Sequence, residues 1–379
     1  MKKYLKFDDQ VVLLHERKEL QKYLEFRKEN DVWVQPYIKE SAVIGIEDHP
    51  LFLSQYFSEN GIGINEESSE CVRDTGLFLS FPVNGERTIY PTRHTAFTSI
   101  CQRAGLSGPT ISNFMETSFK KVLPVTEKAA WLTRGFSLYA QKCNILIRDG
   151  KVSAMMSGGY SVLPADELIN ALEKELEKEH SRLEMSCASI SHEYLNVEYL
   201  LNDPEADASF SLLLQDFGLN GKVKTGIGFA TSDVGLSRAY VYPFFMMGEH
   251  KTRFGDSIGI EHEGKNDVET FTKLLPQADS LFKEAEDQIE KLGNTVIDSV
   301  PHTVRNIADK NKSLFPKTFA EDVVSSLTLT SGNAIDVYLA LNDIVENYIT
   351  SRGNDPTVAL TLKDRLSKYL YVNFEKYDN

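Results

Sequence analysis

A stretch rich in basic and aromatic residues, from Gly85 to Lys151, has the composition that contact with nucleic acid requires. It holds ten lysines and arginines against four acidic residues, so its local charge is +6 inside a chain with a net charge of -14. Basic side chains neutralise phosphates, and unpaired bases stack on aromatic rings. The interleaved aromatic residues are Phe97, Phe114, Phe119, Trp131 and Phe136. The stretch therefore favours a site for single-stranded nucleic acid.

Eight basic residues are the candidates for phosphate contact, six from this stretch and two from further along the chain. They are Arg87, Arg93, Arg103, Lys120, Lys121, Arg134, Arg238 and Arg253. The alternative is that the aromatic residues form a core and the basic residues balance acidic helices elsewhere. A binding site requires the basic side chains to converge on one groove, and this is the observation that separates the two interpretations.

Three carboxylates and an ammonium group near residue 260 form a second candidate site. They belong to Asp256, Glu261, Glu263 and Lys265. Such a set can hold Mg²⁺ beside a general base, as in a metal-dependent nuclease. The alternative is a turn at Gly264 that leads into a helix capped near Asp267. His250 and His262 could add a transition-metal site, although exposed loop histidines are the commoner explanation. No cofactor is predicted, except Mg²⁺ under the nuclease interpretation.

Several common motifs are absent from the sequence. It has no Gly-x-x-x-x-Gly-Lys-Ser/Thr loop and no Gly-x-Ser-x-Gly elbow, and Gly226-Ile-Gly228 lacks the third glycine of a dinucleotide fingerprint. The four cysteines form no Cys-x-x-Cys pair, which favours free, mostly buried thiols in a reducing compartment. The first residues are too charged for a secretion signal, and the longest apolar run, Ala239 to Met247, is too short to span a membrane. We expect a cytoplasmic protein with no membrane partner.

Four sequence blocks stand in an order that matches the motifs of a known family. The blocks are His94 to Gly105, Met156 to Leu163, Thr231 to Lys265 and Asn333 to Ala340. They resemble the phage/plasmid-like protein family catalogued as domain of unknown function 932. Three departures accompany the resemblance: Asp233 stands for the family's glutamate, Gly158-Gly159 fills a step that is commonly polar, and the cysteine and asparagine after the arginine are not evident near Phe244. The resemblance implies a bacterial host and a mobile genetic element.

Three functions follow from these features. The first is a non-enzymatic protein that binds single-stranded DNA during replication or recombination of a phage or plasmid. The second is a metal-dependent nuclease. The third is an acidic interaction module, or DNA mimic, that occupies a host protein; it requires a contiguous negative surface and no affinity for DNA. The sequence leaves a homo-oligomer open.

The helices and strands that must position these residues are predicted most clearly after residue 142. Two strand-like runs, Cys143 to Arg148 and Val152 to Met156, flank Asp149-Gly150, which predicts a hairpin with a type I′ turn. A helix is expected from Asp166 to Leu183. An antiparallel meander should follow. Its expected strands are Ser186 to Leu201, Ala208 to Leu214, Lys222 to Ala230 and Leu236 to Phe245.

A long helix from Asn266 to Leu292, bent at Pro276, should precede a helical carboxy-terminal part. Thr318 and Glu321 match a capping box. We expect an α+β fold, a twisted antiparallel sheet of hairpin and meander with helices packed on one face and a helical carboxy-terminal cap. The 379 residues are divided into a mixed segment, a central α+β core and the cap. These parts span 1–84, 85–310 and 318–379.

Overall fold

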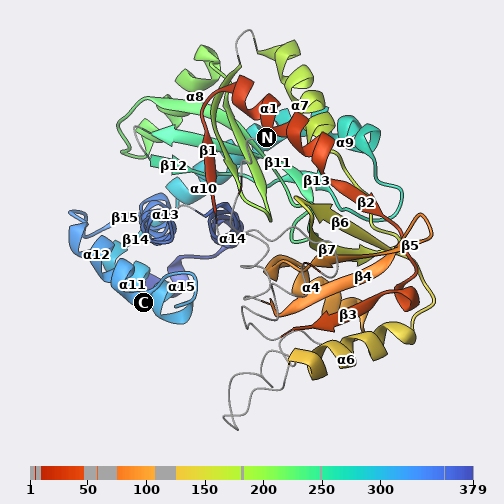
Figure 1. The fold of residues 1–379 in the computed structure, drawn as a ribbon. Coiled ribbons are helices and arrows are strands. Elements are labelled where there is room, and N and C mark those ends of the chain that lie inside the picture. Colours follow the sequence, from red (N-terminus) through yellow and green to blue (C-terminus); the bar gives the residue numbers. More distant parts are fainter. Residues whose placement is uncertain are drawn as a thin grey trace.

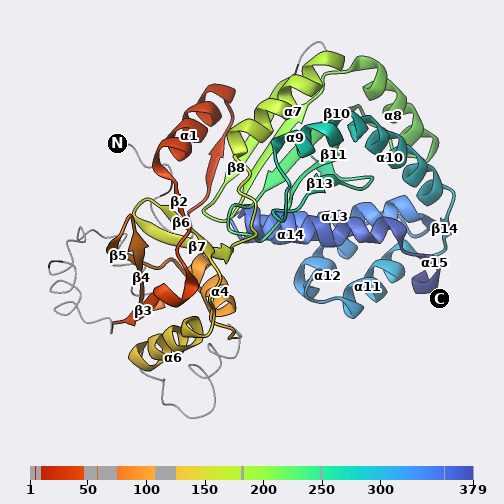
Figure 2. The same ribbon diagram turned by 90° about the vertical axis from the view of Figure 1, so that its right-hand side faces the viewer.

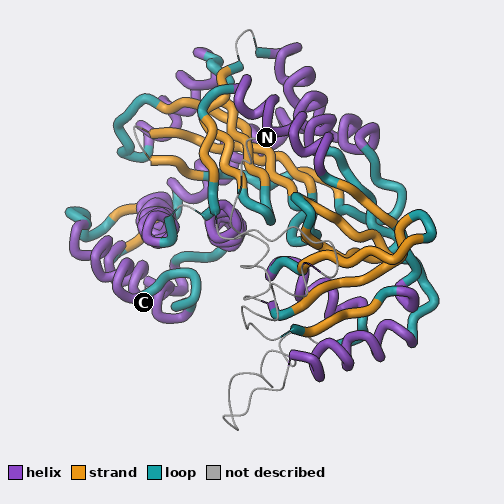
Figure 3. The backbone as a smooth tube through the Cα atoms, in the orientation of Figure 1, coloured by secondary structure: helices purple, strands orange, loops and turns teal. Residues whose placement is uncertain are grey.

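The chain folds as an α+β protein, as the sequence predicted, with strands through the middle of the molecule and helices around them (Figures 1 and 3). The structure is a computed structural model. It describes residues 5, 10–46, 58, 75–106, 125–180, 183–247, 250–353 and 355–378.

The predicted hairpin is present and belongs to a sheet of three strands in the order β2-β6-β7. These strands span Val32–Val34, Cys143–Arg148 and Lys151–Ser157. The turn residues Asp149 and Gly150 have φ values of 54° and 75°. Two successive positive φ values define a type I′ turn, so this prediction is confirmed.

A second sheet of three strands, β3-β4-β5, lies beside the hairpin sheet. Its strands are Ala42–Gly45, Leu77–Val83 and Glu86–Pro91. A bridge between Thr92 and Val152 joins the two sheets. Helices α4 (His94–Arg103) and α6 (Val125–Ser137) pack on them and close a shared apolar core. These two sheets and two helices form the part of the molecule that we call the hairpin lobe.

The predicted meander lies in a separate, larger sheet of seven strands rather than in one sheet with the hairpin. Its path is β1-β8-β9-β10-β11-β12, and β13 pairs with β11. The strands are Val12–Leu14, Glu184–Ile190, Leu195–Leu200, Val223–Thr231, Ala239–Met247, His250–Thr252 and Ile258–Ile260. All pairings in this sheet are antiparallel.

Two strand predictions in the meander differ from the structure. The run from 186 to 201 is not one strand but two, β8 and β9, because it turns where the Ser191 hydroxyl accepts hydrogen bonds from the backbone of Glu193 and Tyr194. The run from 208 to 214 lies inside a helix, α8 (Pro204–Asp216). Asp203 caps this helix by accepting from two backbone N–H groups, and Pro204 occupies its first turn. Those start signals outweigh the strand-like composition of the run.

Helices cover both faces of the seven-stranded sheet, not one face as expected. On one face, α1 (Arg17–Asn30), α7 (Ala165–Glu179) and α9 (Val268–Leu274) share an apolar core with the strands. On the other face, Leu360 of α14 (Pro356–Ser367) packs against aromatic side chains of β11. Figure 2 shows the two layers on either side of the sheet.

The bend at Pro276 is confirmed. The helical segment runs as α9, a short 3₁₀ turn (Leu275–Gln277) that contains the proline, and α10 (Ala278–Gly293). A proline inside a helix removes one backbone hydrogen bond and crowds the preceding turn, so the helix breaks at this point.

The helical carboxy-terminal cap is also present. Its further elements are β14 (Val296–Ile297), α11 (Val300–Lys310), α12 (Lys317–Ser326), β15 (Gly332–Asn333), α13 (Ala334–Ser351), a 3₁₀ turn (Lys368–Tyr371) and α15 (Glu375–Asp378). The capping box predicted at Thr318 is wrong, since α12 begins after Pro316 and has no side-chain cap. A capping box forms instead between Asn333 and Asp336 at the start of α13.

Candidate functional site

An open groove runs between the hairpin lobe and two connections of the large sheet, the turn after β10 and the loop after β13. It consists of two adjoining hollows of about 510 and 560 Å³. Gln102 and Arg103 of α4, together with Ser157 and Gly159 at the end of β7, line both hollows. We call this feature the inter-sheet groove.

Three basic side chains line the inter-sheet groove: Arg103, Lys142 and Arg238. Arg238 donates to the carbonyl and hydroxyl oxygens of Ser257 at 3.1 and 2.9 Å, which fixes its guanidinium group. The Nε atom of Arg103 has no hydrogen-bond partner among the described residues. Two acidic residues, Glu261 and Glu263, line the same groove. The described lining of the groove, with three basic and two acidic residues, is therefore net positive, whereas the whole chain is net negative.

Backbone groups and an apolar side chain are also exposed in the groove. Ser157, Gly158 and Gly159 are exposed where β7 ends. The Gly159 carbonyl accepts from the Gly264 N–H at 3.1 Å, which ties this turn to the loop after β13. Leu236 lines the groove with 49% of its surface exposed. Cations beside apolar surface are what an unpaired strand requires, because its bases and its phosphates make different contacts.

Three stacked rings close one side of the groove. Tyr160 stacks on Trp33 and on His262, with ring centroids 5.7 and 5.1 Å apart. The Tyr160 hydroxyl donates to the Asp233 carbonyl at 3.0 Å, and burial raises the pKa of that hydroxyl. Tyr160 therefore remains a neutral hydrogen-bond donor.

His262 is buried and serves the packing of this wall. One ring nitrogen, Nδ1, lies 3.2 Å from the Ser161 carbonyl, and the other, Nε2, lies 3.2 Å from the Thr231 hydroxyl. A neutral ring that donates through Nδ1 and accepts through Nε2 satisfies both contacts. Burial lowers the pKa of His262, which favours this neutral form.

Two of the eight predicted basic residues, Arg103 and Arg238, meet in the groove. Two others are buried in separate places. Arg93 is fully buried, and its guanidinium group lies 3.1 Å from His192. Arg253 lies 3.4 Å from the centre of the Tyr242 ring and pairs with Asp364 at 2.7 Å. Arg93 and Arg253 are thus unavailable to a strand in the groove, and we do not keep them as contacts.

The remaining predicted basic residues lie outside the groove. Arg87 donates to the Ser80 hydroxyl in the second small sheet and to the Glu40 carbonyl in the 3₁₀ turn before β3. Arg134 is exposed on α6 and lines neither hollow. Lys120 and Lys121 lie outside the described residues. The basic residues between 87 and 151 that the structure describes do not converge on one surface.

The aromatic residues of the same stretch divide in a similar way. Phe97 and Phe136 are buried in the core of the hairpin lobe. Trp131 is 39% exposed on α6, whereas Phe114 and Phe119 lie outside the described residues. Phe97 and Phe136 therefore fit the alternative interpretation, in which the aromatic residues of this stretch form a core.

The carboxylates proposed for a nuclease do not form a metal site in the described part of the chain. Asp256, Glu261, Glu263 and Lys265 are all exposed. No group of three histidine, cysteine, aspartate or glutamate side chains there is arranged to hold a metal ion. Glu261 and Glu263 line the groove, but Asp256 instead accepts a hydrogen bond from the backbone of Ser257.

A network of charged residues beside the stacked rings was not predicted from the sequence. Arg148 donates to Asp31 at 2.6 Å and to Asp233 at 2.7 Å, and it also reaches the His192 carbonyl at 3.1 Å. Burial alone would lower the pKa of Arg148, but the two carboxylates hold it well above its ordinary value. The only signal in the sequence was Asp233, which stands where the family resemblance places an acidic residue.

No family model, curated protein or solved structure matches this chain.

Within the described residues, none of the helices has the length and apolar character that crossing a membrane requires. Cys101 and Cys143 are buried free thiols and Cys187 is a partly buried one, as predicted from the sequence. Cys71 lies outside the described residues.

Proposed function

We propose that this protein binds single-stranded nucleic acid in the inter-sheet groove and catalyses no reaction there. The observation that carries the proposal is the meeting of Arg103, Lys142 and Arg238 along one open groove in an acidic protein. A strand in this groove would place phosphates against the three cations. Its bases would lie over Leu236 and the exposed turn at Gly158 and Gly159.

Two further features support a single strand over a duplex. The groove exposes apolar surface between the hairpin lobe and the connections of the large sheet, on which unpaired bases can stack. A duplex presents its bases only at the floor of its own grooves, so their faces cannot stack on a protein surface. Only three cations are available among the described lining residues, which suits a weak, sequence-tolerant contact. The family resemblance adds the setting, which is DNA replication or recombination of a phage or plasmid in a bacterial cell.

The direct test measures binding of a fluorescein-labelled, 30-nucleotide single strand by anisotropy at low salt. We expect the double variant Arg103→Ala/Arg238→Ala to bind at least tenfold more weakly than the unaltered protein. Each lost phosphate contact removes an electrostatic contribution to affinity. The matched control is Arg87→Ala/Arg134→Ala, which removes the same charge from outside the groove and should bind within twofold of the unaltered protein.

Two results would overturn the proposal. One is the absence of single-strand binding at low salt, which would leave the acidic interaction module as the better hypothesis. The other is an equal loss of affinity in both double variants, because binding would then follow net charge and not the groove.

A further inference from the structure

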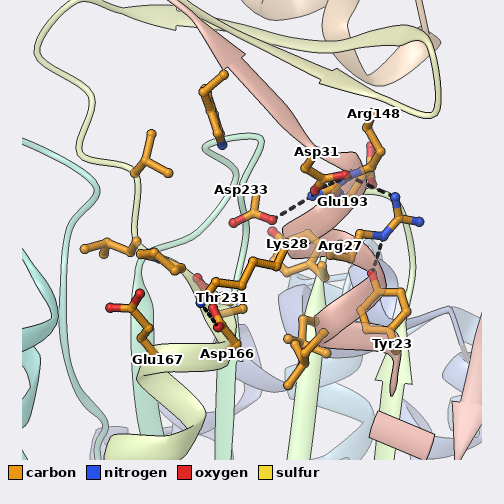
Figure 4. Close-up of a pocket in the computed structure, with 18 of the residues that line it drawn as sticks. Tyr23, Arg27, Lys28, Asp31, Arg148, Asp166, Glu167, Glu193, Thr231 and Asp233 are labelled. Carbon is orange, nitrogen blue, oxygen red and sulfur yellow. Dashed lines mark hydrogen bonds and ion pairs between the residues drawn. The ribbon is translucent and has the colours of Figure 1, made fainter. Parts of the chain in front are cut away.

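A cavity of about 210 Å³ lies on the other side of the stacked rings from the inter-sheet groove. Trp33, whose ring stacks on Tyr160, lines this cavity, and Tyr160 lines the groove. Helix α1, the start of α7, and the turns after β8 and β10 form the remaining wall (Figure 4). A cavity of about 150 Å³ holds a benzene ring. This one therefore has room for a molecule with two fused rings.

The wall of the cavity is apolar and aromatic over much of its area. Leu24, Leu163 and Leu195 are buried core residues, and Tyr194 is 8% exposed. Flat ring systems bury well against such side chains, because apolar contact needs no partner atoms in fixed directions. The shape and the lining thus fit a planar ring better than a flexible polar chain.

The charged groups of the cavity favour hydrogen-bond donors over anions. Its described lining has three basic side chains, Arg27, Lys28 and Arg148, against five carboxylates. Each of the basic side chains already pairs with a carboxylate: Arg27 and Arg148 with Asp31, and Lys28 with Asp166 at 2.9 Å. A phosphate or carboxylate ligand would meet an excess of negative charge and no unpaired cation.

Asp233 is the group most suited to recognise a ligand. Its Oδ2 atom accepts from Arg148 at 2.7 Å, so the carboxylate is held in one orientation (Figure 4). Its Oδ1 atom has no hydrogen-bond donor among the described residues, and the side chain is 30% exposed. A carboxylate fixed in this way accepts hydrogen bonds from N–H groups and repels atoms that present a lone pair.

We infer that this cavity binds a guanine base. Guanine is planar and has two fused rings, and its Watson–Crick edge presents adjacent N–H donors that an acceptor-only carboxylate can take. Adenine has a ring nitrogen lone pair at the corresponding place, which would face the carboxylate without a proton. The base can come from a free nucleoside or from a strand, and the site is separate from the groove and does not depend on it.

The chain has two tryptophans, which makes a local readout possible. In the variant Trp131→Phe, Trp33 is the remaining tryptophan, and its ring lines the cavity and stacks on Tyr160 at the edge of the groove. We expect guanosine to quench Trp33 in a saturable way, inosine to bind more weakly because it has one donor fewer, and adenosine to bind at least tenfold more weakly than guanosine. A ten-nucleotide thymidine strand with one central guanosine, compared with all-thymidine, tests a base that comes from a strand.

Two substitutions test the assignment in the Trp131→Phe background. Asp233→Asn should weaken guanosine binding at least tenfold, because the amide presents donors as well as an acceptor. Ala165→Phe should fill the cavity and abolish quenching without touching the charge network, which keeps the test valid if the first variant unfolds. Asp256→Asn, an exposed aspartate that does not line the cavity, is the control and should bind as the unaltered protein does.

Quenching by either free guanosine or the guanosine-containing strand supports a base site and identifies its source. Three outcomes overturn the inference: quenching by neither, equal binding of adenosine and guanosine, or saturable binding of benzamidine with none of guanosine. The last would show that the cavity takes an organic cation in place of a base.

Discussion

The guanidinium group of Arg148 lies 2.7 Å from the carboxylate of Asp233, and this contact joins the β6–β7 hairpin to the turn after β10. Both elements border the inter-sheet groove and the cavity. Arg148 is also bound to Asp31, at the end of α1, so a single side chain connects three separate segments. The network therefore fixes the walls of both candidate sites at once.

Replacing Arg148 with methionine should destabilise the protein strongly. The change would leave Asp233 without its cation and Asp31 with Arg27 alone, and removing one partner of a buried pair costs about 3–5 kcal/mol. Urea unfolding followed by circular dichroism measures the loss. The control is Lys273→Met, which breaks the exposed pair with Glu269 and should leave the unfolding midpoint unchanged. Equal midpoints for the two variants would mean that the Arg148 network does not stabilise the fold.

Stability should fall between pH 6.5 and pH 5 because of His192. Burial, and then the nearby charges of Arg93 and Arg148, lower the pKa of His192 well below 6.5. In this window the unfolded chain takes up a proton that the folded chain does not. The contribution of neutral His192 to the free energy of unfolding is therefore fully present above the unfolded-state pKa. Below that pKa the free energy of unfolding declines by about 1.4 kcal/mol per pH unit for one such group.

The variant His192→Gln isolates this effect. The glutamine amide can still accept from Arg93, but it does not titrate. We expect the unfolding free energy of the variant to fall less steeply from pH 6.5 to pH 5 than that of the unaltered protein. His262, whose pKa is also lowered, should leave a residual slope in both. Parallel curves would show that His192 is protonated in the folded state as readily as in the unfolded state.

The glycines at the two ends of β7 should differ in their tolerance of alanine. Gly150 has a φ of 75°, and an L-residue in this left-handed region costs about 1 kcal/mol. Gly159 has no positive φ, and a Cβ atom there would meet no heavy atom within 4 Å. Gly150→Ala should therefore lower the unfolding free energy, while Gly159→Ala should not. Thermal unfolding of the two variants provides the comparison, and an equal loss would contradict the type I′ turn.

Local sequence signals predicted the elements that local chemistry decides. The Asp149-Gly150 dipeptide forces a tight turn, and Pro276 breaks a helix, whatever surrounds them. The strand predicted from 208 to 214 failed because the deciding residues, Asp203 and Pro204, lie outside the run. Composition within a segment is weaker than a cap at its start.

The candidate sites were harder to predict because their residues meet through long-range contacts. Arg148 pairs with residues 117 and 85 positions away in the chain, and no periodicity shows this. A lysine or arginine in a basic stretch looks the same in sequence whether it is solvated or buried. The positions of Arg93 and Arg253 required the tertiary structure, as did the meeting of Arg103 with Arg238.

Salt dependence gives a quantitative test of the groove. Each phosphate neutralised on a single strand contributes about -0.7 to the slope of log affinity against log salt, so three groove cations predict a slope of about -2. Lys142→Ala should make the slope less steep by about 0.7, because one contact is lost. Arg134→Ala removes the same charge from outside the groove and should leave the slope unchanged. Anisotropy titrations from 20 to 200 mM salt, roughly a tenfold range, would resolve this difference. A slope near zero, or an equal change in both variants, would show that the strand does not lie in the groove.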